Sequence, residues 1–338
     1  MSKKVSVIIP CRNEEDFILG CLNSVFNSDY PAELIELLVC DGNSEDKTPS
    51  LVQEYAKQKS GVRYLVNEKT TTPFALNLGI THSQGEVILI LGAHTELATN
   101  YISECVAVLN QMPDVWCVGG VLNNISSDEI TSSVSLAMSS PFGVGNAHFR
   151  TGAKDGYVDT VAFGAYPKEV FEKIGLFDEE LARNQDDEFN FRILKNGGKI
   201  WLTTATSATY YVRSSFKKLF KQYFQYGYWK VYVNKKHKSI TTMRQLVPAL
   251  FVLTLYALII MVILFPYRWE YLVLFLGVYG AGASLFALKL AERSNQFFAV
   301  LFSFVILHTS YGMGYVEGIV NFILLNRKPA KSQSNLTR

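Results

Sequence analysis

The sequence has few cysteines and almost no net charge, and each of these absences excludes a class of protein. Its five cysteines all lie in the N-terminal half, and none of them forms a C-x-x-C pair. Neither a zinc site nor a disulfide framework is therefore indicated, so we expect reduced and mostly buried thiols. The net charge of +2 over 338 residues is too small to predict a nucleic-acid partner.

The N-terminus lacks the long apolar core of a secretory signal peptide. A basic pair, Lys3 and Lys4, is followed by an apolar run from Val5 to Ile9 that ends at Pro10. This run is too short for a signal peptide, so we expect the N-terminal domain to stay in the cytoplasm.

Short β-branched runs alternate with helical stretches in the first half of the chain. The expected strands are 5–9, 37–40, 62–66 and 87–91, and the expected helices are 15–27, 48–58, 73–81 and 101–111. This order predicts an α/β domain with a doubly wound, mostly parallel sheet. A second strand-rich stretch, which extends to about residue 203, should complete the sheet.

Polar loops begin where the expected strands end. Their first residues are Pro10, Asp41, Asn67 and Gly92. In a sheet of this kind ligands bind outside the C-terminal ends of the strands, so the four loops should converge on one crevice. We therefore place the candidate site there.

The composition changes after Thr209, where aromatic residues and lysines occupy the same stretch. Basic and aromatic side chains at helical spacing predict an amphipathic helix at a membrane surface, and the solvated face of an ordinary helix is the alternative. Three apolar segments follow. Two of them, 246–265 and 271–288, contain no charged residue and are long enough to cross a bilayer of about 30 Å.

The third apolar segment, 297–325, leaves two paths open. If it spans the membrane, the basic tail lies outside, against the positive-inside bias. A re-entrant or interfacial path around Gly312, Gly314 and Glu317 keeps the tail in the cytoplasm, and we expect this second path. The predicted regions are a domain over 1–212, an amphipathic helix region over 213–240, membrane-anchoring helices over 241–328 and a basic tail over 329–338.

Three motifs carry a family resemblance. They are SVIIPCRNEE at 6–15, VCDGNSEDKT at 39–48 and RNQDDEFNFRILKNGG at 183–198. In this order and spacing they resemble the inverting, nucleotide-sugar-dependent glycosyltransferases of family 2, and most of all the branch that makes succinoglycan-type exopolysaccharides. The resemblance covers about residues 4–235. It implies a GT-A-like α/β fold, followed by an interfacial helix and C-terminal transmembrane helices.

The resemblance assigns the donor nucleoside to the first loop and to the acidic residue after the second strand. The corresponding residues are Pro10, Arg12, Glu14 and Asp41. A carboxylate at the end of a strand accepts strong hydrogen bonds from a base or a ribose. Asp41 is also typical of an Asx turn or helix cap. Lys69 matches a family position that faces the donor phosphates, and a solvated lysine is an equal alternative.

After the fourth strand this family carries Asp-x-Asp or Asp-Ala-His, which helps to hold a divalent metal on the donor diphosphate. Here the residues are Gly92, Ala93 and His94, so the first carboxylate is missing. The resemblance keeps Ala93 among the donor-binding residues. His94, with Glu96 two residues on, leaves a Mn²⁺ or Mg²⁺ site open, and an imidazole ligand favours Mn²⁺. A histidine that only forms hydrogen bonds is the alternative.

The family's catalytic aspartate corresponds to Asp186. In an inverting displacement one carboxylate opposite the leaving group suffices as the base for the acceptor hydroxyl. Asp187 adjoins Asp186, and the sequence does not separate the two; acidic residues at a helix start are the alternative interpretation. Asp159 and Gly164 lie in a segment that resembles the family's acceptor side, with simple turn formation as the alternative.

These residues predict an enzyme that transfers a hexose from a nucleotide sugar, with UDP-glucose favoured by the resemblance, to a polyprenyl-diphosphate-linked or polysaccharide acceptor. The chain has QYFQYGYW at 222–229 instead of the Gln-x-x-Arg-Trp of processive members, so we expect one sugar per encounter. We expect it in the inner membrane, in contact with lipid and with its catalytic domain in the cytoplasm. Because Gly92 replaces the motif aspartate, the alternative is a catalytically impaired binding or assembly partner.

Overall fold

The computed structural model describes residues 2–125, 128–145, 147–152, 154–211, 215–241 and 243–329. The chain divides into two compact units. The first contains Met1–Asn124 and His148–Tyr211, and the second contains Ile125–Ala147 and Val212–Arg338. The expected domain over 1–212 includes the segment Ile125–Ala147, whereas the structure groups this segment with the second unit. Residues 330–338 of the expected basic tail lie outside the described residues.

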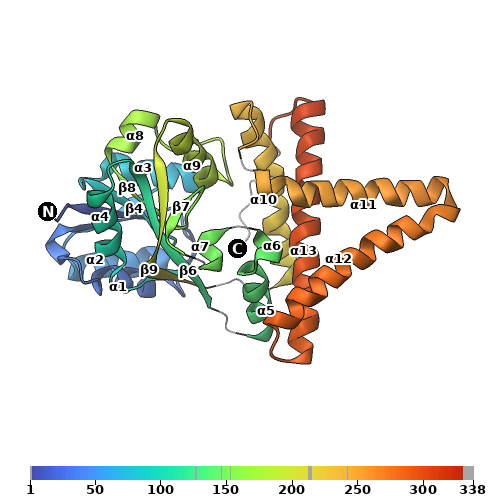
Figure 1. Cartoon of the computed structure of the whole chain (residues 1–338). Helices are drawn as coiled ribbons and strands as arrows, with labels where there is room; N and C mark the ends of the chain where they lie inside the picture. Colours follow the sequence, from blue (N-terminus) through green and yellow to red (C-terminus); the bar gives the residue numbers. More distant parts are fainter. Residues whose placement is uncertain are drawn as a thin grey trace. The chain divides into compact units, whose positions relative to one another are not determined.

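The described residues of the first unit form one nine-stranded sheet with the order β3-β2-β1-β4-β8-β6-β9-β5, and β7 pairs with β9 (Figure 1). The strands are β1 (Val5–Cys11), β2 (Ile35–Asp41), β3 (Val62–Val66), β4 (Val87–Ile90), β5 (Thr95–Leu97), β6 (Val115–Ile125), β7 (Gly156–Val158), β8 (Ala165–Pro167) and β9 (Lys199–Tyr211). The helices are α1 (Ile18–Phe26), the short η1 (Ala32–Leu34), α2 (Thr48–Gln58), α3 (Thr72–His82), α4 (Tyr101–Gln111), α7 (His148–Thr151), α8 (Glu169–Ile174) and α9 (Gln185–Lys195).

The sheet is mixed. Strands β3, β2, β1 and β4 run parallel, as the alternation of strands and helices predicts. By contrast, β8 is antiparallel to β4 and β6, and β9 is antiparallel to β5 and β7. The expectation of a mostly parallel sheet is thus wrong for the second half. Strands β5, β7 and β8 are only three residues long, so they carry little periodic signal from which the pairing could be predicted.

Helices cover both faces of this sheet. Residues of α1 and α4, such as Leu22 and Ile102, fill one core, and residues of α3 and α9, such as Leu76 and Phe189, fill the other. Strands β1 and β2 are buried on both faces, which explains their nearly continuous apolar sequence. All five cysteines are free and buried, so that expectation is confirmed.

The strand register brings the C-terminal ends of the first three strands to one level. Cys11 of β1 pairs with Asp41 of β2, and Asp41 pairs with Val66 of β3. The backbone N–H of Gly42 then donates to the Cys11 carbonyl at 2.8 Å. The loops that leave these strands therefore start side by side.

The second unit is helical in its described part. Its elements are α5 (Glu129–Met138), α6 (Pro141–Val144), α10 (Phe216–His237), η2 (Met243–Leu246), α11 (Val247–Leu264), η3 (Pro266–Arg268), α12 (Trp269–Leu290), α13 (Ser294–Gly318) and the π-helical turn η4 (Ile319–Leu324). Helices α10 and α13 approach closely: a Cβ on Gly227 would lie 2.0 Å from the Tyr311 carbonyl oxygen, and a Cβ on Gly314 would lie 2.0 Å from that of Phe224. Small residues permit this approach, as is usual where membrane helices pack.

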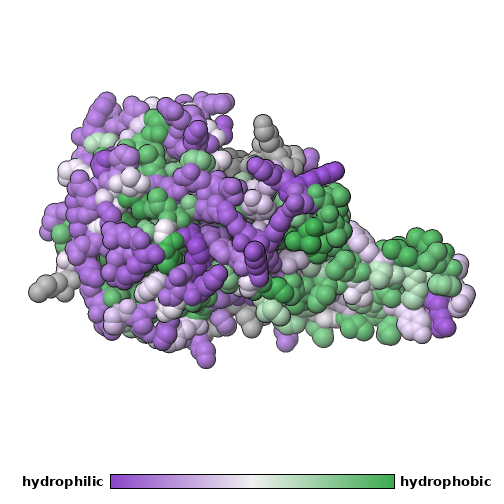
Figure 2. Space-filling model, turned by 90° about the horizontal axis from the view of Figure 1, so that it is seen from above, coloured by the Kyte–Doolittle hydropathy of each residue, from purple (hydrophilic) through white to green (hydrophobic). Residues whose placement is uncertain are grey.

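Three helical segments among the described residues are long and apolar enough to cross a membrane: Met243–Leu264, Pro266–Leu290 and Ser294–Leu324. Hydrophobic side chains gather over the surface of α11 and α12 (Figure 2). Helix α13 continues unbroken through Gly312 and Gly314. Gly312 makes room for α11, because a Cβ on it would lie 2.2 Å from the Pro248 carbonyl oxygen.

Candidate functional site

Asp41 ends β2 in a buried position and is already engaged by neighbouring groups. Its carboxylate accepts hydrogen bonds from the Ser44 N–H at 3.1 Å, from the Ser44 hydroxyl and from the Tyr64 hydroxyl at 2.8 Å. The Ser44 bonds form the turn that was one interpretation of the sequence. Burial, together with the bond to Asp41, raises the pKa of Tyr64, so this phenol remains a donor. A nucleoside that binds Asp41 must share or replace these partners.

The loops after β1 and β2 hold each other in place. The Asn13 and Glu14 N–H groups donate to the Ser44 and Thr48 hydroxyls at 2.7 and 2.8 Å. Asp46 accepts from the N–H of Thr48, the first residue of α2, at 2.9 Å. Burial alone would raise the pKa of Asp46, but hydrogen bonds from Thr48 and from the Glu15 N–H outweigh burial and lower the pKa. These hydrogen bonds hold the two loops together at the C-terminal ends of β1 and β2.

Arg12 and Pro10 lie at the end of β1. Pro10 stands in β1 opposite Cys40. The Arg12 guanidinium is partly exposed and lies 4.0 Å from the Glu45 carboxylate, which is 84% exposed. Exposed pairs of this kind contribute little to stability. Arg12 is therefore able to exchange this partner for a ligand.

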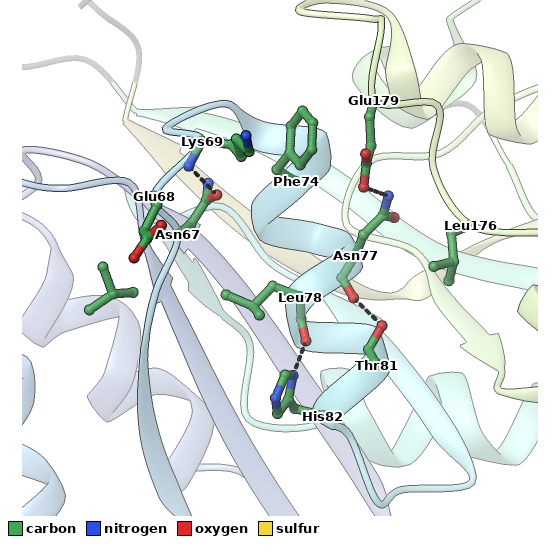
Figure 3. Close-up of a pocket in the computed structure, with 11 residues that line it drawn as sticks. Asn67, Glu68, Lys69, Phe74, Asn77, Leu78, Thr81, His82, Leu176 and Glu179 are labelled. Carbon is green, nitrogen blue, oxygen red and sulfur yellow. Dashed lines mark hydrogen bonds between the residues drawn. The ribbon is translucent and has the colours of Figure 1, made fainter.

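Lys69 lies in the loop between β3 and α3, next to Asp41. The Asn67 N–H donates to the Asp41 carbonyl at 2.7 Å, and the Thr70 carbonyl oxygen would lie 3.1 Å from a Cβ on Gly42. Lys69 also lines an open groove of about 410 Å³ across the outer side of α3 (Figure 3). In that groove Asn77 donates to the Glu179 carboxylate at 2.9 Å. Lys69 thus stands between the donor-side loops and this groove.

The space at Gly92 is partly filled. A Cβ there would lie 3.0 Å from the Phe163 ring and 3.2 Å from the Thr95 hydroxyl. Phe163 has a left-handed backbone (φ +50°), and the Tyr101 hydroxyl donates to its carbonyl at 3.0 Å. The buried Thr95 hydroxyl has no hydrogen-bond partner among the described residues. Ala93 is buried, so only its backbone is suited to contact a ligand.

His94 faces Glu14. Its Nδ1 lies 3.6 Å from Glu14 Oε2, and the Glu14 side chain is buried. The imidazole makes edge-on contacts with Phe17 and Tyr210, with ring centroids 6.4 and 4.9 Å away. Two residues that the sequence assigned to different roles, nucleoside and metal binding, are thus neighbours.

The described residues contain no group of three or more His, Cys, Asp or Glu side chains that could hold a metal ion. Glu96, the second candidate near His94, accepts a hydrogen bond from the Tyr211 hydroxyl at 3.0 Å. Its carboxylate also fills the space where Gly20 would carry a Cβ. A cation at His94 would therefore need most of its ligands from the donor or from water.

Three acidic residues, Asp186, Asp187 and Glu188, lie in the first turn of α9 and have different surroundings. Asp186 is exposed and Asp187 is half-buried. Glu188 is buried, and both of its oxygens accept from Arg192, at 2.8 and 2.9 Å. Arg192 also donates to the carbonyls of Ile174 and Leu176. Glu188 is thus structural, whereas Asp186 faces the surface.

Tyr166 is buried beside Gly164, next to the end of β4. Burial raises the pKa of Tyr166, and the charges of Cys117 and Asp186 raise it further. The Tyr166 hydroxyl packs at Gly164, whose carbonyl accepts from the Ile90 N–H at 3.0 Å. Gly164 itself is buried by Tyr166 and Cys117, so its small size serves packing.

The structure thus brings the four predicted loops together through contacts among Cys11, Gly42, Thr70 and the pair of Glu14 and His94.

Sequence reasoning missed Tyr64 and Phe163. For Tyr64 the sequence contains only a weak indication: in the expected strand 62–66 its side chain lies on the face opposite to those of Arg63 and Leu65. Phe163 had none, because its contact with Gly92 joins segments about 70 residues apart.

Known protein families and proteins resemble this chain over much of its length. The family described as Glycosyl transferase family 2 matches residues 6–175. A Methanococcus voltae protein named dolichyl N-acetyl-alpha-D-glucosaminyl phosphate 3-beta-D-2,3-diacetamido-2,3-dideoxy-beta-D-glucuronosyltransferase is 35% identical over 231 residues, which are 66% of this chain and 71% of that protein. The succinoglycan biosynthesis protein ExoA of Rhizobium meliloti is 26% identical over 249 residues, 72% of this chain and 73% of its own length.

One solved structure extends the comparison to most of the chain. The mannosyltransferase PcManGT of Pyrobaculum calidifontis, in complex with GDP-Man and Mn²⁺, superposes with a TM-score of 0.61 and 18% identity. The superposition covers 92% of this chain and 87% of that chain. At this identity the likeness concerns the fold, which is GT-A-like.

Proposed function

The chain belongs to glycosyl transferase family 2, and from this premise we propose that it transfers a hexose from a nucleoside-diphosphate sugar to a lipid-linked or polysaccharide acceptor, with inversion at the anomeric carbon. The names of its relatives support the acceptor class: one acts on a dolichyl-linked sugar phosphate and another takes part in succinoglycan biosynthesis. The three apolar helices support synthesis at a membrane, which we assign to the cytoplasmic face of the inner membrane.

The observation that carries the proposed mechanism is the division of the acidic cluster on α9. Glu188 is paired with Arg192, whereas Asp186 is exposed in the same turn of α9. We assign it as the base. Asp186 takes the proton of the acceptor hydroxyl while the oxygen attacks the anomeric carbon and the nucleoside diphosphate leaves from the opposite face. Asp187 is the second candidate for this role.

The donor belongs at the convergent loops. We assign the nucleoside to Pro10, Arg12 and Asp41, whose strand ends lie side by side. We assign Lys69, whose loop begins beside Asp41, to neutralise phosphate. Ala93 contributes its backbone to the same end of the site. Specificity for glucose and for UDP is part of this proposal, and both follow from the resemblance alone.

A divalent cation fits the loop after β4, where we place the donor diphosphate, although this loop supplies few protein ligands. Cations of this kind are commonly held by one or two side chains together with substrate phosphates and water. His94 supplies an imidazole, and the Thr95 hydroxyl near Gly92 has no hydrogen-bond partner among the described residues. When bound, Mn²⁺ or Mg²⁺ would stabilise negative charge on the departing diphosphate.

The direct test is release of nucleoside diphosphate by the detergent-solubilised protein. A panel of UDP- and GDP-hexoses is supplied with a polyprenyl-diphosphate-linked acceptor extract and with Mn²⁺, Mg²⁺ or EDTA. Acceptor-dependent release with one donor would support the proposal, and the anomeric configuration of the product, read by NMR, tests inversion. Nucleotide binding without release by any donor would instead support a non-catalytic assembly partner, which the glycine at position 92 favours.

A further inference from the structure

Helix α13 differs from α11 and α12 in how much protein covers it. Its most apolar stretch is 50% buried by the protein itself, whereas the corresponding stretches of Met243–Leu264 and Pro266–Leu290 are 11% buried. By length and composition all three segments could cross a membrane, so packing is what sets α13 apart. Its partner along most of its length is α10.

Helix α10 runs beside α13 in the same direction. At the start of α10, the ring of Phe216 meets that of Phe302 edge-on, with centroids 5.0 Å apart. At the other end, Lys235 Nζ donates to the Phe322 carbonyl at 2.7 Å. The stretch from Phe302 to Phe322 is about 30 Å long at the helical rise of ~1.5 Å per residue, which equals the thickness of a bilayer core. Any path that takes α13 through a bilayer therefore takes α10 with it.

The sequence of α10 is unsuited to hydrocarbon. Lys217, Lys218 and Lys221 are exposed in its first turns, and Gln225 and Lys230 follow in its middle. Among the described residues, α10 does not belong to the segments that are apolar enough to cross a membrane. Charged side chains inside a bilayer are costly and rare. A membrane surface, where lysines reach water and lipid phosphates, suits this helix better.

Helices α11 and α12 meet α13 only at the base of the hairpin that they form. Pro248 and Val252, in the first turns of α11, pack at Gly312. In the second half of α12, the Tyr279 hydroxyl lies 2.9 Å from His308 Nδ1. The rest of both helices, up to the turn η3 that joins them, is largely exposed, and Figure 1 shows them projecting away from α13. The hairpin can thus enter a bilayer without carrying α13 across it.

The part of α13 that protein leaves uncovered is a narrow apolar stripe. Phe298, Phe302 and Met313 are 66%, 51% and 36% exposed, and their spacing places them on one face of a helix with 3.6 residues per turn. Val320 and Ile323 expose further apolar surface in the turn η4. We call these five residues the α13 stripe. A helix with one apolar face and covered remaining faces is typical of a membrane surface.

Basic side chains flank the α13 stripe at both ends. At one end, Lys217 and Lys221 of α10 are exposed near the contact between α10 and Phe302. At the other end, Arg327 and Lys328 are exposed directly after η4. Cations beside an apolar strip complement a bilayer that contains anionic lipids, because its phosphates lie just above its acyl chains.

We propose that α13 does not cross the membrane but lies along its surface beside α10, and that the α13 stripe with its basic ends binds anionic lipid. The stripe enters the headgroup region, the basic ends pair with lipid phosphates, and α11 and α12 form the crossing hairpin. Lys328 then lies on the same side of the membrane as the first unit. The inference rests on the proposed membrane location and not on the transferase reaction, so it is tested without a sugar donor.

Chemical labelling of the full chain in bacterial membranes tests the path of α13. Lys57→Cys marks the first unit, Tyr267→Cys marks the turn of the hairpin and Lys328→Cys marks the residues after η4. All three positions are exposed, whereas the native cysteines are buried. With a membrane-impermeant maleimide, Lys57→Cys and Lys328→Cys should react from one side and Tyr267→Cys from the other. Reaction of Lys328→Cys from the side opposite to Lys57→Cys would overturn the proposal, because α13 would then cross.

Spin labels measure depth after reconstitution into vesicles of phosphatidylcholine and phosphatidylglycerol. Labels at Phe298→Cys, Met313→Cys and Val320→Cys should share one shallow depth, read from their collisions with oxygen and with a nickel chelate. Val278→Cys is the matched control, since this residue is 67% exposed near the middle of α12 and should lie deep. A Met313→Cys label as deep as that of Val278→Cys would overturn the proposal. A Val278→Cys label in water would instead overturn the membrane location itself.

Lipid preference tests the basic ends. In the same vesicles, wild-type protein should immobilise spin-labelled phosphatidylglycerol more than spin-labelled phosphatidylcholine. This preference should fall by about twofold or more in Lys217→Gln/Lys221→Gln and in Arg327→Gln/Lys328→Gln, because each lysine or arginine near a membrane surface attracts anionic lipid. Lys57→Gln, on α2, is the control and should change nothing. An unchanged preference in both double variants would overturn the assignment to anionic lipid.

A second copy of the chain is the competing occupant of the α13 stripe. Size-exclusion chromatography with light scattering measures the mass of the protein in detergent. Phe302→Ser should leave this mass unchanged, since detergent or lipid covers the stripe in the wild type. A wild-type dimer that dissociates in Phe302→Ser would overturn the proposal and assign the stripe to a subunit interface.

Discussion

At the scale of single residues, the start of α9 separates two aspartates that the sequence leaves equivalent. Asp186→Asn keeps the size of an exposed side chain and removes its basicity. We expect turnover to fall by roughly 10²- to 10⁴-fold, the usual contribution of a general base, while binding of the nucleoside diphosphate is unchanged. Asp187→Asn should cost less than about tenfold. The measurement is nucleoside diphosphate release at saturating donor, and the reverse order of the two variants would move the base to Asp187.

Gly92 offers a second test at this scale. The neighbours of its would-be Cβ are the edge of the Phe163 ring, which can shift, and the unpartnered Thr95 hydroxyl, which would gain an acceptor. We expect Gly92→Asp to fold and to bind Mn²⁺ in the presence of UDP about tenfold more tightly, or about 1.4 kcal/mol. Gly92→Asn has the same size without the charge and should show no gain. Equal effects of the two variants would refute an electrostatic role for position 92.

These residues show what a single sequence reveals about a site. Asp41 and Asp186 were proposed from motifs that resemble a known family, and their positions at a strand end and a helix start were predictable from the chain itself. The partners Tyr64 and Phe163, and the pairing of Glu14 with His94, depend on contacts between segments far apart in the sequence. No local pattern encodes such contacts.

At the scale of secondary-structure elements, Glu36 links the first three strands at their N-terminal end. It accepts from the Ser6 hydroxyl at 2.6 Å, from the Gln84 N–H at 2.8 Å and from Arg63 at 3.2 Å. Burial alone would raise the pKa of Glu36, but these hydrogen bonds outweigh burial and lower it. A lowered pKa in the folded state stabilises the protein above the unfolded value of about 4.3, and this stabilisation is lost as the pH falls through the folded pKa.

Glu36→Gln should therefore be less stable than wild type at pH 7, by about 1–3 kcal/mol. The difference should shrink as the pH is lowered from 5 to 3, because protonation removes the same charge from the wild type. Denaturant unfolding followed by circular dichroism at several pH values measures both quantities. A difference that does not change over this range would show that the charge of Glu36 makes no contribution.

Helix packing gives a matched pair of glycines. A Cβ on Gly314 of α13 would lie 2.0 Å from the Phe224 carbonyl of α10, whereas a Cβ on Gly277 of α12 would have no atom within 4 Å. Gly314→Ala should lower the unfolding free energy by about 1–3 kcal/mol or more, since backbone must move. Gly277→Ala should be neutral or slightly stabilising. Thermal unfolding in detergent compares the two, and equal midpoints would contradict the packing of α10 on α13.

The elements themselves were largely predictable. Four parallel strands and their helices follow from hydrophobic periodicity, and the apolar helices α11 and α12 follow from composition. The path of the third apolar segment relative to a membrane stays a prediction, because glycines in an apolar helix mark close packing as well as turns. Antiparallel pairing in the second half of the sheet was missed because short strands such as β7 and β8 carry little periodic signal.

At the scale of the whole molecule, the two units interleave along the chain, since Ile125–Ala147 belongs with the C-terminal helices. Phe142 of α6 stacks on Phe286 and meets Phe304 edge-on, with ring centroids 5.1 and 4.9 Å apart. A chain that ends at Tyr211 would leave this aromatic surface without its partners. We expect that fragment to aggregate, and the same fragment with residues 126–146 replaced by a Gly/Ser linker of equal length to be more soluble. Size-exclusion chromatography compares them, and equal behaviour would contradict the grouping.

The hydrogen bond from His308 to the Phe142 carbonyl, 2.8 Å long, joins residues 166 positions apart. On the ribosome, α5 and α6 emerge long before the helix that binds them has been made. Closing a loop of this length costs about 4.5 kcal/mol of chain entropy by the (3/2)RT ln n relation, so the contact forms only when enough other interactions offset that cost. The second unit therefore completes its folding only after α13 has been synthesised, when α13 captures a segment that was made in the first half of the chain.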